Sequence, residues 1–393
     1  MNAINEKYLM KVATRPDVVM VRGQGSYLWD DTGRRYLDFV QGWAVNALGH
    51  APSEIAEALA KQASILLTPS PAYHNGPQIR LAERLCTLTG LDEVHFSSSG
   101  AEANEVAVKL ARKWGRLNKR GAFEVVTTHN GFHGRTLAMM AASGKPGWSD
   151  LFPPNPPGFR HVAFGDAAAM SEAITEKTAA IMVEPIQGEA GVIVPTMGYL
   201  RQLRGMADEA NVLLILDEVQ TGLGRTGRLF AFEHEEVKPD ILTLGKGLGG
   251  GFPISATLAR TRASCLELGD QGGTFNGNPL GACVANAVLD TVLDDEFLVA
   301  VRDNGRHLVD RLQHSAREFG FRDVRGMGLL VAIELSSALA TNVRDAAFER
   351  GLLINAARPT ILRFMPSLRV SHAEIDEAVA RLHESLASVR AAA

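Results

Sequence analysis

One stretch of the chain decides the expected fold: Asp240-Ile241-Leu242-Thr243-Leu244-Gly245-Lys246-Gly247-Leu248-Gly249-Gly250-Gly251. An apolar run of strand length leads into a lysine whose neighbours are mostly glycine, so a flat ligand can approach the amine closely. A lysine that bonds covalently to a carbonyl ligand needs that approach, together with a lowered pKa. Most lysines are solvated surface charges, however, and most glycine runs are flexible loops, so Lys246 alone does not define a site.

Similar apolar runs recur through the middle of the chain, at residues 125–126, 180–183 and 212–216, and residues 94–96 read as a further strand end. Segments with helical periodicity lie between them, at residues 102–116 and 200–210. The runs are apolar throughout rather than alternating, which is typical of strands covered on both faces. This pattern predicts a large α/β domain with a mostly parallel central sheet.

The two ends of the chain have a different pattern. Residues 20–40 predict a small antiparallel unit, and the end of the chain predicts a long helix, strands and a final helix at residues 297–319, 329–335 and 374–389. We therefore expect residues 1–60 and 293–393 to form a smaller α+β domain beside a large domain of residues 61–292. Residues 146–157 hold five prolines and predict a surface loop that is a candidate lid.

The composition excludes several classes of protein. The 393 residues are 46% apolar and 21% charged, with a net charge of −4, and the chain has no basic stripe of the kind that binds nucleic acid. The chain has no run of about 18 apolar residues, so no membrane helix is predicted. The first residues lack the basic segment followed by an apolar segment that is typical of a secretory signal. Three scattered cysteines, Cys86, Cys265 and Cys283, show no metal-ligand spacing and favour a reducing cytoplasm.

A candidate phosphate site lies at residues 97–104, Ser-Ser-Ser-Gly-Ala-Glu-Ala-Asn. Small residues that join a strand to a helix leave backbone N–H groups free at the positive end of the helix, where phosphate binds. An ordinary helix cap explains the same residues, because Ser99 followed three positions later by Glu102 forms a capping box.

A candidate acid lies at the end of another apolar run, in Leu213-Leu214-Ile215-Leu216-Asp217-Glu218-Val219-Gln220. Open α/β sheets bind ligands at the carboxyl ends of their strands, and a carboxylate there keeps a pyridine nitrogen protonated. The alternative is that Asp217 caps a turn. The run also resembles the magnesium-binding strand of P-loop ATPases, but no Gly-x4-Gly-Lys-Ser/Thr occurs. Residues 222–227 match Gly-x-Gly-x-x-Gly, but lie too far from the strand for a dinucleotide fingerprint.

Two further segments supply groups that suit an organic acid. Phe132 and Arg135 lie in Gly-Phe-His-Gly-Arg-Thr at residues 131–136, and Arg363 lies in Ile-Leu-Arg-Phe-Met-Pro at residues 361–366. Phe132 can stack on a flat ring, and each arginine can hold a carboxylate with two hydrogen bonds. Taken singly, they are better explained by a packed aromatic ring and by surface ion pairs.

Together these segments resemble the class III (ω-amino acid) aminotransferases, which have fold type I of the pyridoxal phosphate (PLP) enzymes, the aspartate aminotransferase-like fold. Within that family the chain is most similar to the acetylornithine aminotransferases. The matching stretches span nearly the whole chain in the family order: residues 42–50, 99–111, 132–136, 185–192, 216–227, 243–253, 273–279 and 362–368.

The resemblance implies which residues bind pyridoxal 5'-phosphate: Ser99, Gly100, Ala101, Phe132, Asp217, Val219, Gln220, Lys246 and Thr274. Lys246 would bond to the cofactor and move the proton, while Asp217 would pair with the ring nitrogen. Phe132 and Val219 would enclose the ring, Gln220 would lie near its phenolic oxygen, and the N–H groups of Gly100 and Ala101 would hold the phosphate. Thr274 would reach the phosphate of the neighbouring subunit, which implies a homodimer with shared active sites.

The resemblance also implies the substrates. Arg135 matches the arginine that binds a substrate carboxylate, and Glu189 and Arg363 match an ion pair that opens for one substrate and closes for the other. The expected reaction transfers the δ-amine of N2-acetylornithine to 2-oxoglutarate, which gives N-acetylglutamate 5-semialdehyde and glutamate in arginine biosynthesis. Alternatives are succinylornithine, succinyl-diaminopimelate, ornithine or 4-aminobutyrate as donor, a non-catalytic PLP-binding protein, and a nicotinamide dehydrogenase.

Four positions depart from the family pattern. Gly42, next to Trp43, stands where ornithine aminotransferases carry a tyrosine for the free α-amine, which favours an acylated donor. His74 stands where an aromatic residue or threonine is usual and is a candidate for altering the acyl pocket, with an ordinary surface histidine as the alternative. Ala190 replaces a glycine beside Glu189, and residues 272–277 depart from the commonest phosphate loop.

Overall fold

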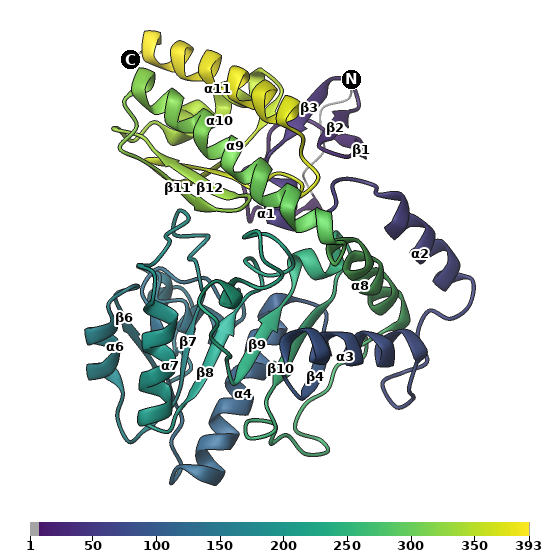
Figure 1. The fold of residues 1–393 in the computed structure, drawn as a ribbon, viewed down its shortest axis with the longest axis vertical. Coiled ribbons are helices and arrows are strands. Elements are labelled where there is room, and N and C mark those ends of the chain that lie inside the picture. The colour runs from purple at the N-terminus through teal and green to yellow at the C-terminus, as the bar shows by residue number, and fades with distance from the viewer. Residues whose placement is uncertain (1–7, 393) are drawn as a thin grey trace.

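The structure is a computed structural model that describes residues 8–392. Residues 1–7 of the expected 1–60 segment lie outside the described residues, and so does the start of the chain for which no secretory signal was predicted. The chain forms two lobes, with a seven-stranded sheet in one and two smaller sheets under α9–α11 in the other (Figure 1). Among residues 8–392, no helix is long and apolar enough to cross a membrane, and no cluster of side chains suits a metal ion.

The large sheet has the strand order β4-β10-β9-β8-β7-β5-β6. Its strands are β4 (Glu93–Ser97), β5 (Glu124–Thr128), β6 (Phe159–Val162), β7 (Thr178–Val183), β8 (Leu213–Asp217), β9 (Ile241–Leu244) and β10 (Ser255–Ala259). Its lobe also contains α2 (Ser53–Ala63), α3 (Gly76–Thr89), α4 (Gly100–Asn118), α5 (Leu137–Ala142), η2 (Trp148–Asp150), α6 (Ala167–Ala173), α7 (Tyr199–Glu209), η3 (Ala231–His234), η4 (Lys246–Gly249) and α8 (Pro279–Val292).

The prediction of a mostly parallel sheet is confirmed, with one exception. Strand β10 runs antiparallel to both β4 and β9. Only residues 245–254 connect β9 to β10, and a parallel return needs a crossover of about a dozen residues or more. The short connection therefore forces β10 to reverse, which the apolar character of its residues did not reveal.

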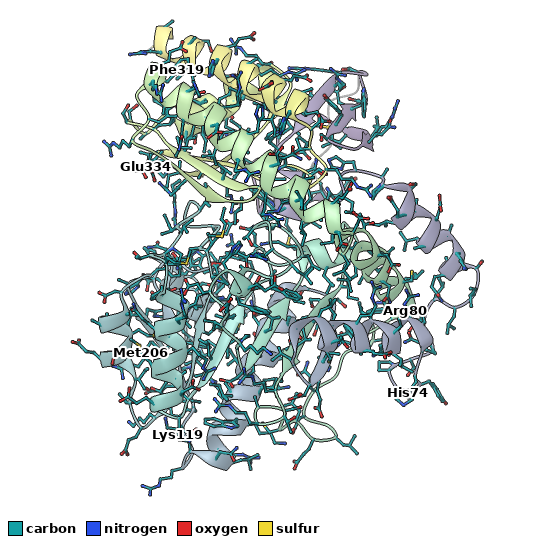
Figure 2. The ribbon with its side chains drawn as sticks, viewed as in Figure 1. His74, Arg80, Lys119, Met206, Phe319 and Glu334 are labelled. Atoms are coloured by element: carbon teal, nitrogen blue, oxygen red, sulfur yellow. The ribbon has the colours of Figure 1, made fainter. Side chains whose placement is uncertain are left out.

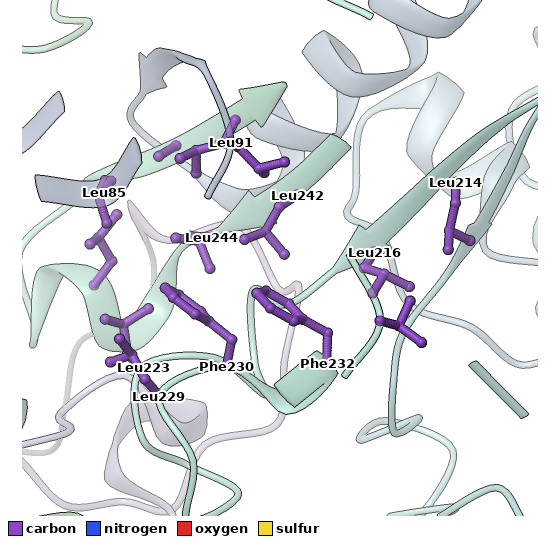
Figure 3. Close-up of a cluster of buried hydrophobic side chains, with 14 of the residues drawn as sticks. Leu85, Leu91, Leu214, Leu216, Leu223, Leu229, Phe230, Phe232, Leu242 and Leu244 are labelled. Atoms are coloured by element: carbon purple, nitrogen blue, oxygen red, sulfur yellow. The ribbon is translucent and has the colours of Figure 1, made fainter. Parts of the chain in front are cut away.

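Both faces of the sheet are buried, as the continuous apolar runs predicted. In β8, Leu213 and Ile215 pack on the face covered by α4, whereas Leu214 and Leu216 pack on the opposite face. On that opposite face, Figure 3 shows Phe230 and Phe232 beneath the leucines of β8 and β9, with ring centroids 5.3 Å apart. Strands covered in this way are rigid, so the loops at their carboxyl ends start from fixed positions.

The second lobe joins the two ends of the chain. Strand β3 pairs in parallel with β13 through Leu37 and Leu352, and the strand orders are β1-β2-β3-β13 and β11-β12-β15-β14. The strands are β1 (Met20–Gln24), β2 (Tyr27–Asp30), β3 (Arg35–Asp38), β11 (Asp323–Met327), β12 (Leu330–Glu334), β13 (Leu352–Leu353), β14 (Asn355–Arg358) and β15 (Ile361–Phe364). The helices are α1 (Gln41–Ala44), α9 (Asp295–Phe319), α10 (Ala340–Glu349) and α11 (His372–Ala392). The antiparallel unit predicted for residues 20–40 and the two long terminal helices are confirmed.

Two loops named in the sequence have simple structures. Residues 146–157 form a loop that contains the short turn η2 and lies along a hollow beside His129 and His161. Residues 222–227 run as consecutive turns that lead into no helix, so the geometry of a dinucleotide fingerprint is missing there.

Candidate active site

A cavity of about 250 Å³ lies at the carboxyl ends of the parallel strands, where the sequence placed the site. Its lining brings together segments that are far apart in the chain: Gly100, Ala101, Asn104, Phe132, His133, Gly134, Arg135, Glu184, Ile186, Glu189, Asp217, Val219, Gln220, Thr221 and Lys246. Nine of these fifteen residues belong to the set named from the sequence. The structure thus gathers most of the expected residues around one space.

Lys246 begins the turn η4 directly after β9 and has a φ of 41°. This left-handed conformation is strained for a residue with a side chain, and such strain concentrates at functional sites. Burial is the main cause that lowers the pKa of the Lys246 amine, and the nearby Arg363 guanidinium also lowers it, against the Glu189 carboxylate. An amine with a lowered pKa is more often neutral, and only the neutral amine is nucleophilic.

Glycines keep the neighbouring backbone close to Val219. A Cβ added at Gly100 would lie 2.7 Å from Val219 Cγ1, and one added at Gly245 would lie 3.2 Å from the same atom. The strand end at Gly245, the start of α4 at Gly100 and the turn after β8 therefore meet without intervening side chains. Such a narrow, flat space beside a lysine suits a planar ligand.

Asp217 is held by a network that the sequence did not reveal. Its Oδ2 accepts a 2.7 Å hydrogen bond from Asn104 Nδ2 and lies 2.8 Å from His133 Nδ1, while the Val219 N–H donates to Oδ1 at 3.0 Å. Thr243 donates its hydroxyl to Asn104 Oδ1 at 2.7 Å and so fixes the amide. All five groups come from motifs quoted above, but nothing in sequence spacing shows that they converge.

Ser99 serves the helix cap. Its hydroxyl accepts from the Glu102 N–H at 3.3 Å, and the Glu102 carboxylate accepts from the Ser98 N–H at 2.9 Å. Ser99 does not line the cavity, whereas Gly100 and Ala101, the first residues of α4, do. The capping explanation of the serine thus holds, and the helix start still faces the cavity, where its dipole favours an anion.

Arg363 comes from β15 in the second lobe and is completely buried. Its Nη2 donates to Glu189 Oε1 at 2.6 Å, its Nη1 to Gln220 Oε1 at 3.3 Å and its Nε to Asn355 Oδ1 at 3.1 Å. Burial acts to raise the pKa of Glu189, but the Arg363 guanidinium outweighs it and holds the pKa below its usual value. The expected switch pair is therefore formed and charged.

Glu184 is a second acid that sequence reasoning missed, although it follows β7 as Asp217 ends β8. It is buried, lines the cavity, and its Oε2 has no hydrogen-bond partner among residues 8–392. Burial, together with repulsion from Asp217, raises its pKa well above the usual value. Burial at this position therefore favours the protonated, neutral form of the Glu184 carboxyl group.

Two cations and two rings meet at the mouth of the cavity. The Arg135 guanidinium lies 4.5 Å from the ring centroid of Trp148, and Lys145 Nζ lies 4.9 Å from it. The same cations lie 5.7 and 4.6 Å from the ring of Phe132. Arg135 is exposed, so it can receive an anion that arrives from solvent.

The structure places five other residues named from the sequence outside the lining of the cavity. Thr274 is exposed and borders a separate hollow beside residues 68–71. His74 is also exposed, at the outer edge of the large-sheet lobe near the start of α3 (Figure 2), so within this chain it does not shape the cavity. Gly42 and Trp43 lie in a left-handed turn with φ of 61° and 66°, where Trp43 lies 5.8 Å from the Arg363 guanidinium, and Ala190 is buried beside Glu189.

The residues of the cavity fit PLP. A lysine with a lowered pKa, a hydrogen-bonded aspartate and a helix start match the aldehyde, the ring nitrogen and the phosphate. Gln220 Nε2 is buried and has no partner among the described residues, so a donor is free for an oxygen on the ring.

Comparisons with known proteins agree with this geometry. A family model described as aminotransferase class-III matches residues 9–386. The chain is 51% identical over 385 residues to acetylornithine aminotransferase 2 of Bordetella bronchiseptica, with 97% of each chain covered.

Solved structures show the same fold. An ornithine aminotransferase from Toxoplasma gondii, reported with partial occupancy of PLP at its active site, is 35% identical with a TM-score of 0.93 and covers 98% of this chain and 93% of its own. N-acetylornithine aminotransferase from Stenotrophomonas maltophilia is 36% identical with a TM-score of 0.86, and 99% of each chain is covered. These likenesses confirm fold type I of the PLP-dependent transferases, and the chain belongs to the class-III aminotransferase family.

Proposed function

We propose that this PLP-dependent aminotransferase transfers the δ-amine of N2-acetylornithine to 2-oxoglutarate, giving N-acetylglutamate 5-semialdehyde and glutamate in arginine biosynthesis. The observation that carries the proposal is the buried pair of Glu189 and Arg363 at the cavity that contains Lys246. Full-length identity of 51% to an acetylornithine aminotransferase supports the choice of donor.

PLP, when bound, withdraws electrons from the substrate carbon that loses a proton. Lys246 would bond to it, Asp217 would keep its ring nitrogen protonated, and Phe132 and Val219 would enclose its ring. The N–H groups of Gly100 and Ala101 would hold the phosphate, with the Ser99 cap fixing the helix start. Gln220 would donate Nε2 to the phenolic oxygen.

Lys246 also moves the proton. Once its amine is free, burial lowers the pKa of the amine and so favours the neutral form, which can take the proton from the substrate carbon that carries the reacting nitrogen. Asp217 accepts a hydrogen bond from Asn104 and lies beside His133, away from the proton transfer, so Lys246 and Asp217 have separate tasks.

The pair of Glu189 and Arg363 lets one site accept two unlike substrates. An acylornithine that enters with its δ-amine first brings no carboxylate near the reacting carbon, so Glu189 neutralises the buried guanidinium. Glutamate brings an α-carboxylate there, and Arg363 then binds it while Glu189 moves away. Arg135 at the mouth binds the distal carboxylate of either substrate, and the reaction alternates between the two.

We further propose a homodimer in the cytoplasm. Thr274 is exposed and outside the cavity of its own chain, which suits a residue that reaches the phosphate of a neighbouring subunit. We also propose the small domain of both chain ends, supported by the pairing of β3 with β13. Its first boundary is best placed before α2 rather than at residue 60, because α2 is continuous across that position and packs on α8.

A panel of donors tests the proposed substrate. With 2-oxoglutarate as acceptor, the highest kcat/KM is expected for N2-acetylornithine among acetylornithine, succinylornithine, succinyl-diaminopimelate, ornithine and 4-aminobutyrate. Gly42 offers no hydroxyl to a free α-amine, so ornithine should react poorly. A preference for ornithine or 4-aminobutyrate would replace the proposed donor and leave the reaction type in place.

A further inference from the structure

The switch described above needs a second position for Glu189. When a substrate carboxylate takes Arg363, the departing Glu189 becomes an anion in a largely buried site, and such a charge is strongly unfavourable without a partner. Glu189 and Phe132 line the same cavity, and Lys145 Nζ lies 4.6 Å from the Phe132 ring. The cations that hold down the pKa of the Glu189 carboxylate are Arg363, Lys246 and Lys145. Arg363 then holds the substrate and Lys246 serves the cofactor, so Lys145 is the one that stays available.

The surroundings of Lys145 suit a cation that accepts the Glu189 carboxylate. Its ammonium lies over the rings of Phe132 and Trp148, at 4.6 and 4.9 Å, and among residues 8–392 no acid forms an ion pair with it. Burial lowers the pKa of the Lys145 amine, and Arg358 and Arg135 lower it further. The Glu189 carboxylate opposes this lowering most strongly, ahead of Glu184. A partly buried ammonium that has only aromatic faces for contact gains by accepting a carboxylate.

We propose that Lys145 is the alternative partner of Glu189, a positioning residue that receives the carboxylate whenever a substrate occupies Arg363. The inference rests on the proposed two-substrate reaction. Glu189 then has a cation in both states, so opening the pair exchanges one ion pair for another instead of leaving a buried charge. A ligand that brings a carboxylate to Arg363 depends on Lys145, whereas an acylornithine, for which Glu189 stays on Arg363, does not.

The two half-reactions of the holoenzyme, followed separately by cofactor absorbance in single turnovers, test this assignment. Lys145→Gln should lower kcat/KM of the glutamate half about 10-fold and that of the acetylornithine half by no more than about 2-fold, as expected for loss of one charge-assisted contact. Lys145→Arg should restore most of the loss. Lys177→Gln is the matched control. Lys177 is exposed just before β7, at the amino-terminal end of that strand, whereas the cavity lies at the carboxyl ends of the strands.

A double-mutant cycle separates coupling from simple structural damage. In a Glu189→Ala background no carboxylate needs a second partner, so Lys145→Gln should have no further effect on the glutamate half. Glutarate binding, measured by calorimetry, supplies a readout without turnover and should weaken about 10-fold in Lys145→Gln but not in the double variant.

Equal losses in both halves would overturn the proposal and assign Lys145 to the distal carboxylate beside Arg135. An undiminished effect of Lys145→Gln on the glutamate half in the Glu189→Ala background would overturn the proposal as well. So would the absence of any effect of Lys145→Gln in the wild-type background. Failure of the proposed donor looks different: the wild-type enzyme would then react with glutamate but not with acetylornithine, and the coupling of Lys145 to Glu189 would still be measurable.

Discussion

Arg363 Nη2 lies 2.6 Å from Glu189 Oε1, and the two residues are 174 positions apart and belong to different lobes. The contact joins β15 of one lobe to the loop after β7 of the other. Glu189 and Lys246 line the same cavity, so the ion pair proposed to switch between substrates is held by both lobes at once.

Glu189→Ala should damage the acylornithine half-reaction about 10- to 100-fold more than the glutamate half, because only the former leaves the buried guanidinium unpaired. Single-turnover rates with each substrate measure the difference. Equal losses in the two halves would rule out a switch and leave the pair a purely structural one.

Asn104→Ala should weaken cofactor binding about 10-fold, because a buried hydrogen bond to a charged group contributes about 1.5–3 kcal/mol and Asp217 loses its 2.7 Å donor. Cofactor affinity is measured by titrating the apoenzyme. Asn118→Ala at the far end of the same helix is the control, because within residues 8–392 the side-chain amide of Asn118 bonds only to Trp114 O. An unchanged affinity in Asn104→Ala would show that the network does not support the aspartate.

The sequence predicted the parts of the fold that depend on local pattern. Continuous apolar runs such as residues 212–216 identified strands buried on both faces, and the helical periodicity of residues 102–116 identified α4. The reversal of β10 was not predictable from its own residues, because strand direction depends on the length of the connection rather than on hydrophobicity.

The candidate site was likewise predictable only in part from the sequence. Lys246, Asp217 and Arg363 could be named from the sequence, because they stand in motifs that together resemble one family. The contact of His133 with Asp217 joins residues 84 positions apart, and a histidine in sequence gives no sign of what it will face. Glu184 was missed because its chemistry comes from burial, which the sequence does not state.

Gly100→Ala should weaken cofactor binding and destabilise the fold by about 1–3 kcal/mol, because the new Cβ would lie 2.7 Å from Val219 Cγ1 in a packed site. Gly205→Ala provides the opposite control. Gly205 lies in α7, a Cβ there meets nothing within 4 Å, and the change should stabilise by about 0.5–1 kcal/mol. Thermal and urea unfolding of both variants decide the matter, and a neutral Gly100→Ala would show that the close approach is not needed.

Glu218 should give the fold a distinct pH dependence. Burial raises its pKa to about 7, against about 4.3 in an unfolded chain. Between these values the folded protein keeps a proton that the unfolded chain has released, so this contribution is complete at low pH and is lost as pH rises, up to about 3 kcal/mol. Glu218→Gln cannot titrate, so the difference between its free energy of unfolding and that of wild type should change between pH 5 and pH 8. Parallel pH profiles would refute the assignment.

The most direct measurement locates the covalent bond to PLP. The purified holoenzyme is reduced with borohydride and digested, and the modified peptide is identified by mass spectrometry. The account predicts one reduced cofactor adduct, on Lys246, and its loss in Lys246→Ala with the fold intact. An adduct on another lysine such as Lys145, or a colourless protein that takes up no cofactor and gives no adduct, would contradict it.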